Sequence, residues 1–199
     1  MNRYLILLFS LLVVCLNGKA QISIGLKDSR YAFLNYTLKD HYDFRIDQSL
    51  YSSKISTQYL RGIVGYHSDF DSLKFEGDAY FGSAYGGAYQ NYGASASVVY
   101  HPIKWMSLIG TANPHYDTFY GFDFCYKAGI IGHVHKDIDL LAYYTTIPDF
   151  RQSEKRVRAG FNFHILNLQV EPTISLPLVK PIESVRVQVC CCYTFEQKN

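Results

Sequence analysis

Apolar side chains occupy every second position of segment 185–195, close to the end of the chain. They are Val185, Val187, Val189, Cys191, Tyr193 and Phe195, and most residues between them are polar. Because successive side chains of a β-strand point to opposite faces, this segment is predicted to be a strand with one apolar and one polar face. The same alternation recurs along the chain, whereas no helical periodicity persists over a useful length.

Turn-forming residues interrupt the alternation at intervals. The breaks lie near residues 28, 40, 53, 70, 86, 102, 115, 136, 151, 166 and 180. Strands of about 10 residues between them would leave about five residues for each connection, which is a usual length. The pattern therefore predicts 12 strands, with ten as the alternative. The alternation is weakest in segments 55–67, 103–112 and 138–147. Pro172 lacks an N–H group and is therefore expected at a strand end or a bulge.

The first 20 residues have the layout of a secretory signal peptide. Arg3 supplies a positive start, residues 5–16 form an apolar run, and Gly18-Lys19-Ala20 offers small residues for cleavage before Gln21. The apolar run is too short to span a bilayer, which takes roughly 20 residues. We therefore expect a cleaved signal peptide, residues 1–20, followed by one domain, residues 21–199.

Export and alternation together favour a closed barrel in a membrane. Every backbone N–H and C=O group at hydrocarbon depth needs an internal partner, and a closed sheet supplies all of them. A two-sheet sandwich also permits alternation, but the apolar faces here are rich in large aromatic residues, and the chain has 18 Tyr and 13 Phe. Tyrosine suits the membrane–water boundary. The expected fold class is all-β, a closed antiparallel up-and-down transmembrane β-barrel.

The lengths of the connections agree with this topology. If the first strand starts on the periplasmic side, the connections at 113–118, 147–154 and 177–183 face outward. The tight connections at His101-Pro102 and Leu166-Asn167 then face the periplasm. Long external loops and short periplasmic turns are typical of outer-membrane barrels.

Three short stretches carry a resemblance to a known class of proteins. They are the Gln21 start after Lys19-Ala20, the turn at His101-Pro102-Ile103-Lys104-Trp105 and the Tyr193-Thr194-Phe195 ending. They resemble small outer-membrane β-barrel proteins of Bacteroidetes-type Gram-negative bacteria, an uncharacterised family. The resemblance implies an outer-membrane location, contact with outer-membrane lipids, and recognition of the last strand by the barrel-insertion machinery during biogenesis. Residues 196–199, which follow Phe195, depart from the usual aromatic ending.

The charges give no support for a nucleic-acid partner. The chain has 19 Lys+Arg against 17 Asp+Glu, and the signal peptide takes Arg3 and Lys19 without an acid, so the mature chain is formally neutral. Charged residues fall instead on the polar side of the strands, where they would face the lumen. These candidates for lumen-facing or ion-paired charges are Asp43, Arg45, Asp47, Lys74, Glu76, Asp78, Asp123, Lys127, Arg156, Arg158, His164, Glu171 and Arg186. Such charges tune the selectivity of a channel, or they pair and fill the lumen of a structural barrel.

A third interpretation is a lipid-modifying hydrolase of the outer membrane, with His115 and Asp117 in the expected external loop as candidates. A hydrolase needs a nucleophile beside a histidine, and none stands out, because Ser107 lies at the other end of its strand. In the expected loop at 148–156, Phe150 and Arg151 are candidates for contact with a surface partner. No cofactor or metal is expected. The sequence favours a structural or interaction barrel, or a small-solute channel with a charged lumen, over the enzyme.

The cysteines of the mature chain are expected to be small strand residues and not disulfides. They are Cys125, Cys190, Cys191 and Cys192. Neighbours in a strand point to opposite faces, and residues two apart in an extended segment are too distant for easy bridging.

Overall fold

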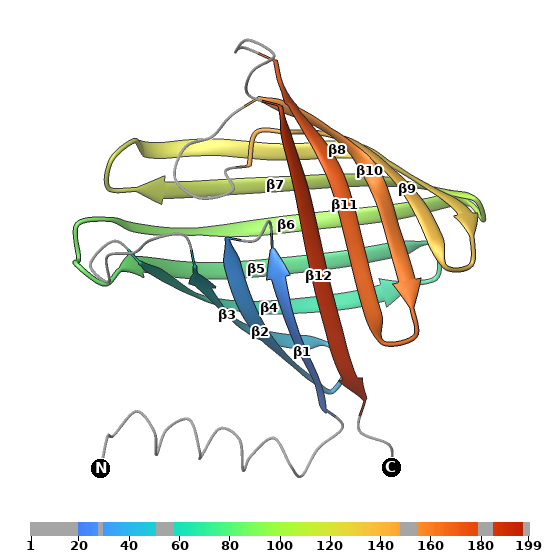
Figure 1. Ribbon diagram of the computed structural model, residues 1–199, viewed down its shortest axis with the longest axis horizontal. Helices are drawn as coiled ribbons and strands as arrows, with labels where there is room; N and C mark the ends of the chain where they lie inside the picture. Colours follow the sequence, from blue (N-terminus) through green and yellow to red (C-terminus); the bar gives the residue numbers. More distant parts are fainter. Residues whose placement is uncertain (1–19, 28–29, 51–57, 148–154, 179–184, 197–199) are drawn as a thin grey trace.

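The computed structural model is a closed barrel of 12 antiparallel strands (Figure 1). It describes residues 20–27, 30–50, 58–147, 155–178 and 185–196. The strands are β1 (Ala20–Lys27), β2 (Tyr31–Leu38), β3 (Tyr42–Ser49), β4 (Tyr59–Phe70), β5 (Leu73–Ala84), β6 (Gln90–Ile103), β7 (Met106–Asp117), β8 (Gly121–His135), β9 (Ile138–Thr145), β10 (Arg156–Ile165), β11 (Leu168–Pro177) and β12 (Arg186–Glu196). The expected signal peptide lies outside the described residues, except for Ala20, which begins β1.

Each strand pairs with its sequence neighbours, and β1 closes the ring by pairing with β12. In the closing pair Ile22 lies opposite Phe195, and Ile24 lies opposite Tyr193. The prediction of 12 strands in an up-and-down barrel is therefore confirmed, including strands in the three segments of mixed pattern. Among the described residues, no helix is long and apolar enough to cross a membrane.

The outer and inner faces of the barrel differ in the way that a bilayer requires. Large apolar side chains are exposed along the outer face, for example Val64, Val98 and Ile130. Inside, buried polar and charged residues outnumber buried apolar ones. A soluble sandwich would have the reverse arrangement, with an apolar interior between its sheets. The polarity of the interior thus separates the two folds that alternation alone permitted.

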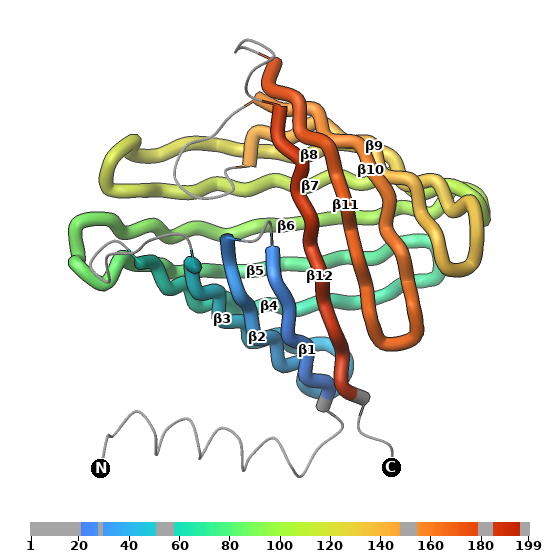
Figure 2. Tube along the Cα trace, viewed as in Figure 1, coloured from blue at the N-terminus to red at the C-terminus, as the bar shows by residue number. Residues whose placement is uncertain are grey.

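The two ends of the barrel carry different connections. One end, called the turn end here, has the short connections 39–41, 71–72, 104–105, 136–137 and 166–167. The first and last strands also start and finish at the turn end, since Gln21 lies opposite Glu196 (Figure 2). The other end, called the loop end, has the remaining connections, among them 50–58, 146–155 and 178–185. The expected contrast between short and long connections is present.

Two predicted connections were wrong in position. The turn expected at His101-Pro102 lies at 104–105, because β6 continues to Ile103. The loop expected at 113–118 is mostly strand, since β7 runs to Asp117 and the turn follows at 118–120. The run of polar residues there indicated a loop. Those residues instead face a polar lumen, where alternation places hydrophilic side chains.

Pro172 was also placed wrongly, because it lies inside β11 and not at a strand end or bulge. The β10–β11 pairs stop at Gly160↔Thr173 and resume at Phe163↔Val170 without a shift in register. A proline has no N–H to donate to a ladder. The barrel accommodates it by leaving two pairs of this ladder unmade.

Candidate functional site in the barrel lumen

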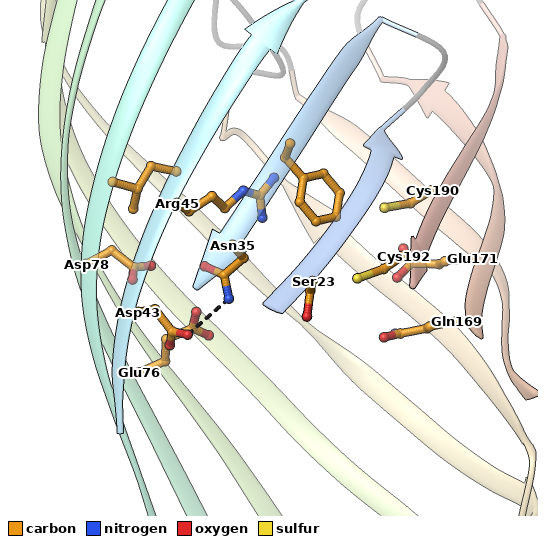
Figure 3. A pocket seen from close by; sticks show the side chains of 12 residues that line it. Ser23, Asn35, Asp43, Arg45, Glu76, Asp78, Gln169, Glu171, Cys190 and Cys192 are labelled. Carbon is orange, nitrogen blue, oxygen red and sulfur yellow. Dashed lines mark hydrogen bonds between the residues drawn. The ribbon is translucent and has the colours of Figure 1, made fainter. Parts of the chain in front are cut away.

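A cavity of about 320 Å³ lies inside the barrel (Figure 3). Most of the side chains that form its wall are charged, amide, hydroxyl or thiol groups. They are Ser23, Phe33, Asn35, Asp43, Arg45, Ile63, Glu76, Asp78, Gln169, Glu171, Cys190 and Cys192. These residues come from β1 to β5 and from β11 and β12, so the site exists only because the sheet closes.

Acidic side chains gather on one wall of the cavity, where Figure 3 shows Asp43, Glu76 and Asp78 close together. Oδ1 of Asp43 accepts hydrogen bonds from Asn35 Nδ2 at 3.1 Å and Thr37 Oγ1 at 2.6 Å. Its Oδ2 lies 2.7 Å from Nδ1 of His67. The hydrogen bonds hold this carboxylate in one orientation toward the cavity.

A buried ion pair borders the cavity towards the loop end. Asp47 is 1% exposed, and its two oxygens lie 2.5 Å from Nε of Arg45 and 2.5 Å from Nη2 of Arg61. The guanidinium of Arg45 also lies over the ring of Phe33, with 4.2 Å between its central carbon and the ring centroid. A cation against an aromatic face is attracted by the ring. These contacts fix Arg45 as a cationic part of the cavity wall.

Basic side chains also come from β8, β10 and β12. Arg156 and Arg158 are buried, and Nη1 of Arg156 donates to Oγ of Ser175 at 3.1 Å. Lys127 interacts electrostatically with Glu76 and with Glu171. The lumen therefore carries both acids and bases, and β3 alone contributes Asp43, Arg45 and Asp47.

A cluster of buried residues, three of them tyrosines, lies at the loop end. Tyr31, Tyr59, Ala84 and Tyr89 pack together, and the rings of Tyr59 and Tyr89 have centroids 5.9 Å apart. The hydroxyl of Tyr59 donates to Oδ1 of Asn91. Sequence reasoning missed this cluster, because Tyr59 falls in a segment of mixed alternation and Tyr89 precedes its strand.

A polar network near the turn end was also missed. Oγ of Ser107 lies 2.6 Å from Nε2 of His133, and Nδ1 of His133 lies 2.7 Å from Oδ1 of Asp139. The same Oγ of Ser107 also lies 2.6 Å from Nδ1 of His101. Ser107 is 0% exposed. The other oxygen of Asp139 lies 3.0 Å from Nε2 of His164. The network joins five strands, β6 to β10, so no single stretch of sequence signals it.

The remaining predicted site residues lie in several environments. Lys74 pairs with Asp69 at 3.4 Å in an exposed position near the turn end. Arg186 begins β12 at the loop end, where it lies opposite Ser175. Asp123 on β8 lies opposite His115 on β7. Phe150 and Arg151 lie outside the described residues.

The expected placement of His115 and Asp117 in an external loop was wrong. Both residues face inward from β7 and are buried, at 4% and 1% exposed. Oδ1 of Asp117 accepts hydrogen bonds from the backbone N–H groups of Phe119 and Tyr120, each at 2.7 Å. An aspartate that binds backbone groups two and three residues ahead stabilises a turn. Asp117 therefore closes the turn after β7.

Among the described residues, Cys125, Cys190, Cys191 and Cys192 form no disulfide. Cys190 and Cys192 line the cavity, whereas Cys125 is fully buried.

Comparisons with known proteins concern the fold. No protein-family model matches the chain, and no curated protein matches its sequence. Among solved structures, the KdgM porin in complex with disordered oligogalacturonate aligns with a TM-score of 0.65 at 10% identity, covering 89% of this chain and 99% of that one. The NanC porin aligns with a TM-score of 0.51 at 8% identity, covering 90% of this chain and 100% of that one. At such identities the likeness concerns the fold alone: the chain has the fold of outer-membrane β-barrel porins.

Proposed function

We propose that this protein is an outer-membrane channel for small polar solutes. The observation that carries the proposal is a polar cavity of about 320 Å³ inside a closed barrel whose outer face is apolar. Such a volume holds on the order of ten water molecules or a small solute. The fold likeness to the KdgM and NanC porins supports the same role.

The charged wall gives the channel a means of selection. Asp43, Glu76 and Asp78 lie on one side of the cavity and Glu171 on another, while Arg45 is held by Asp47. Rings of charged side chains set ion selectivity in pores. The acids facing the cavity favour the passage of cationic groups.

The hydrolase remains the weaker candidate. Ser107, His133 and Asp139 have the spacing of a Ser-His-Asp triad. A nucleophile must reach its substrate, however, and Ser107 is 0% exposed between two histidines. A structural role therefore fits the network better than catalysis, since its hydrogen bonds link neighbouring strands near the turn end.

Conductance of the folded protein in planar lipid bilayers tests the channel. We expect discrete current steps, and a reversal potential in a salt gradient that indicates cation preference. The double variant Glu76→Gln/Asp78→Asn should move the reversal potential toward anions, while the control Asp40→Asn, in an exposed turn, should leave it unchanged. Folded protein without conductance would show a filled structural barrel instead, and phospholipid turnover abolished by Ser107→Ala would favour the hydrolase.

We also infer that export removes residues 1–20 and that the turn end faces the periplasm, with lipids around the barrel and the insertion machinery as a partner during biogenesis. The start of β1 and the end of β12 both lie at the turn end, which supports this orientation. Mass spectrometry of outer-membrane material should find Gln21 as the first residue. Mature protein that begins at Met1 would contradict the inference.

A further inference from the structure

Three metal-ligating side chains meet on the lumen side of β7 and β8. His115 lies directly opposite Asp123, and Cys125 is two residues further along the same face of β8. One ligand atom of each residue, an imidazole nitrogen, a carboxylate oxygen and the thiol sulfur, lies within 4.8 Å of the other two. The cluster is separate from the cavity described above, whose wall contains none of these residues.

Two of the three residues are buried, and the cluster includes an unsatisfied donor or acceptor. His115 is 4% exposed and Cys125 is 0% exposed. Among the described residues, Nδ1 of His115 is buried without a hydrogen-bond partner, as is Oδ2 of Asp117, two residues away on the same face. A buried polar group without a partner costs free energy. A bound cation next to these groups would remove that cost.

The surrounding structure holds His115 in place. Pro114 has no N–H to donate to β6, and the side chain of Asn113 donates instead to the carbonyl of Ala94 at 3.1 Å. On the other side of His115, Asp117 fixes the turn through its Oδ1. Ligands whose positions are set by surrounding hydrogen bonds lose less entropy when a metal binds.

We propose that His115, Asp123 and Cys125 bind a divalent transition-metal ion of the zinc class. Zinc takes cysteine, histidine and carboxylate ligands, and three protein ligands leave a fourth position for water or a solute. Calcium and magnesium prefer sites made only of oxygen ligands. Ligand atoms around tetrahedral zinc are about 3.3–3.8 Å apart, so the side chains need to close by only about 1 Å.

The thiol already lies next to a carboxylate, with Sγ of Cys125 at 3.6 Å from Oδ2 of Asp123. A cysteine binds zinc as the thiolate. Metal binding therefore forms a sulfur–metal bond and releases the thiol proton to solvent. This site does not depend on the proposed channel function.

Titration of the full-length protein, folded in detergent and stripped with a chelator, tests the site. We expect one equivalent of Zn²⁺ to bind by calorimetry, and one equivalent of Co²⁺ to give a thiolate-to-metal absorption band. Cys125→Ser should abolish the band, and both Cys125→Ser and His115→Gln should weaken Zn²⁺ binding more than tenfold. The matched controls are Cys190→Ser, a cavity cysteine, and His41→Gln, an exposed histidine, and both should bind as the wild type does.

Several results would overturn the proposal. They are the absence of stoichiometric binding, unchanged binding in Cys125→Ser, and loss of binding in Cys190→Ser. If the cluster variants fail to fold, X-ray absorption of the zinc-loaded wild type decides. One sulfur at about 2.3 Å from zinc supports the site, whereas a shell of only oxygen and nitrogen contradicts it.

Discussion

Replacing Asp47 by asparagine removes a negative charge that Arg45 and Arg61 share inside the barrel. Asp47 is 1% exposed, and its oxygens lie 2.5 Å from Arg45 Nε and 2.5 Å from Arg61 Nη2. The substitution keeps the shape of the side chain but leaves two cations facing a neutral amide. Removing one partner of a buried ion pair costs about 3–5 kcal/mol.

The structure places the expected cost at the lower end of that range. The side chains of Arg45 and Arg61 are 29% and 22% exposed, so water partly solvates the cations that remain. We expect the free energy of unfolding to fall by about 3 kcal/mol, which is more than a hundredfold in the unfolding equilibrium. Guanidinium unfolding in detergent micelles, followed by the fluorescence of the single tryptophan, Trp105, measures the change.

The exposed pair Asp69–Lys74 provides the matched control. Its side chains are 64% and 56% exposed at a separation of 3.4 Å. Exposed ion pairs contribute about 0–1 kcal/mol, so Asp69→Asn should change stability by no more than this. If Asp47→Asn costs less than about 1 kcal/mol, or no more than Asp69→Asn, the reasoning about burial is refuted.

Five further substitutions probe the packing, the lipid face and the turn-end network. Gly160→Ala places a methyl group 2.1 Å from a carbonyl oxygen of β11, so it should cost about 1–3 kcal/mol by denaturant unfolding. At Gly110 an added methyl group has no atom within 4 Å, so Gly110→Ala should leave the free energy of unfolding unchanged. Equal losses of stability in Gly160→Ala and Gly110→Ala would contradict the packing. Ile130→Arg, in the middle of the outer face, should cost about 2–4 kcal/mol in lipid vesicles, and Val134→Arg, near the turn end, about 0–1 kcal/mol; the reverse order would contradict the membrane position. Ser107→Ala leaves two histidine nitrogens without their partner and should cost about 1–3 kcal/mol without changing conductance.

Alternation along the sequence determined much of this protein by itself. A period of two residues identifies strands, and the absence of a free edge in a membrane requires a closed sheet. The inward and outward sides of the strands follow from the same period, as in β12, where Val187, Val189 and Tyr193 are exposed on the outer face. These features are local, so a single chain read in order reveals them.

The positions of turns were harder to predict, because hairpin ends depend on how the flanking strands pair. The turn expected at His101-Pro102 lies at 104–105, and β7 continues through Pro114 to Asp117. Polar residues predict loops in soluble proteins, but a barrel with a polar lumen places them inside strands.

Only the tertiary structure decided which inward residues meet. Asp47 and Arg61 lie opposite each other on β3 and β4, and His133 reaches Ser107 and Asp139 from a third strand. Contacts of this kind depend on strand register, and a shift of one residue would turn every side chain to the other face. Each strand supplied its own polar side, and closure of the ring brought those sides together around a lumen.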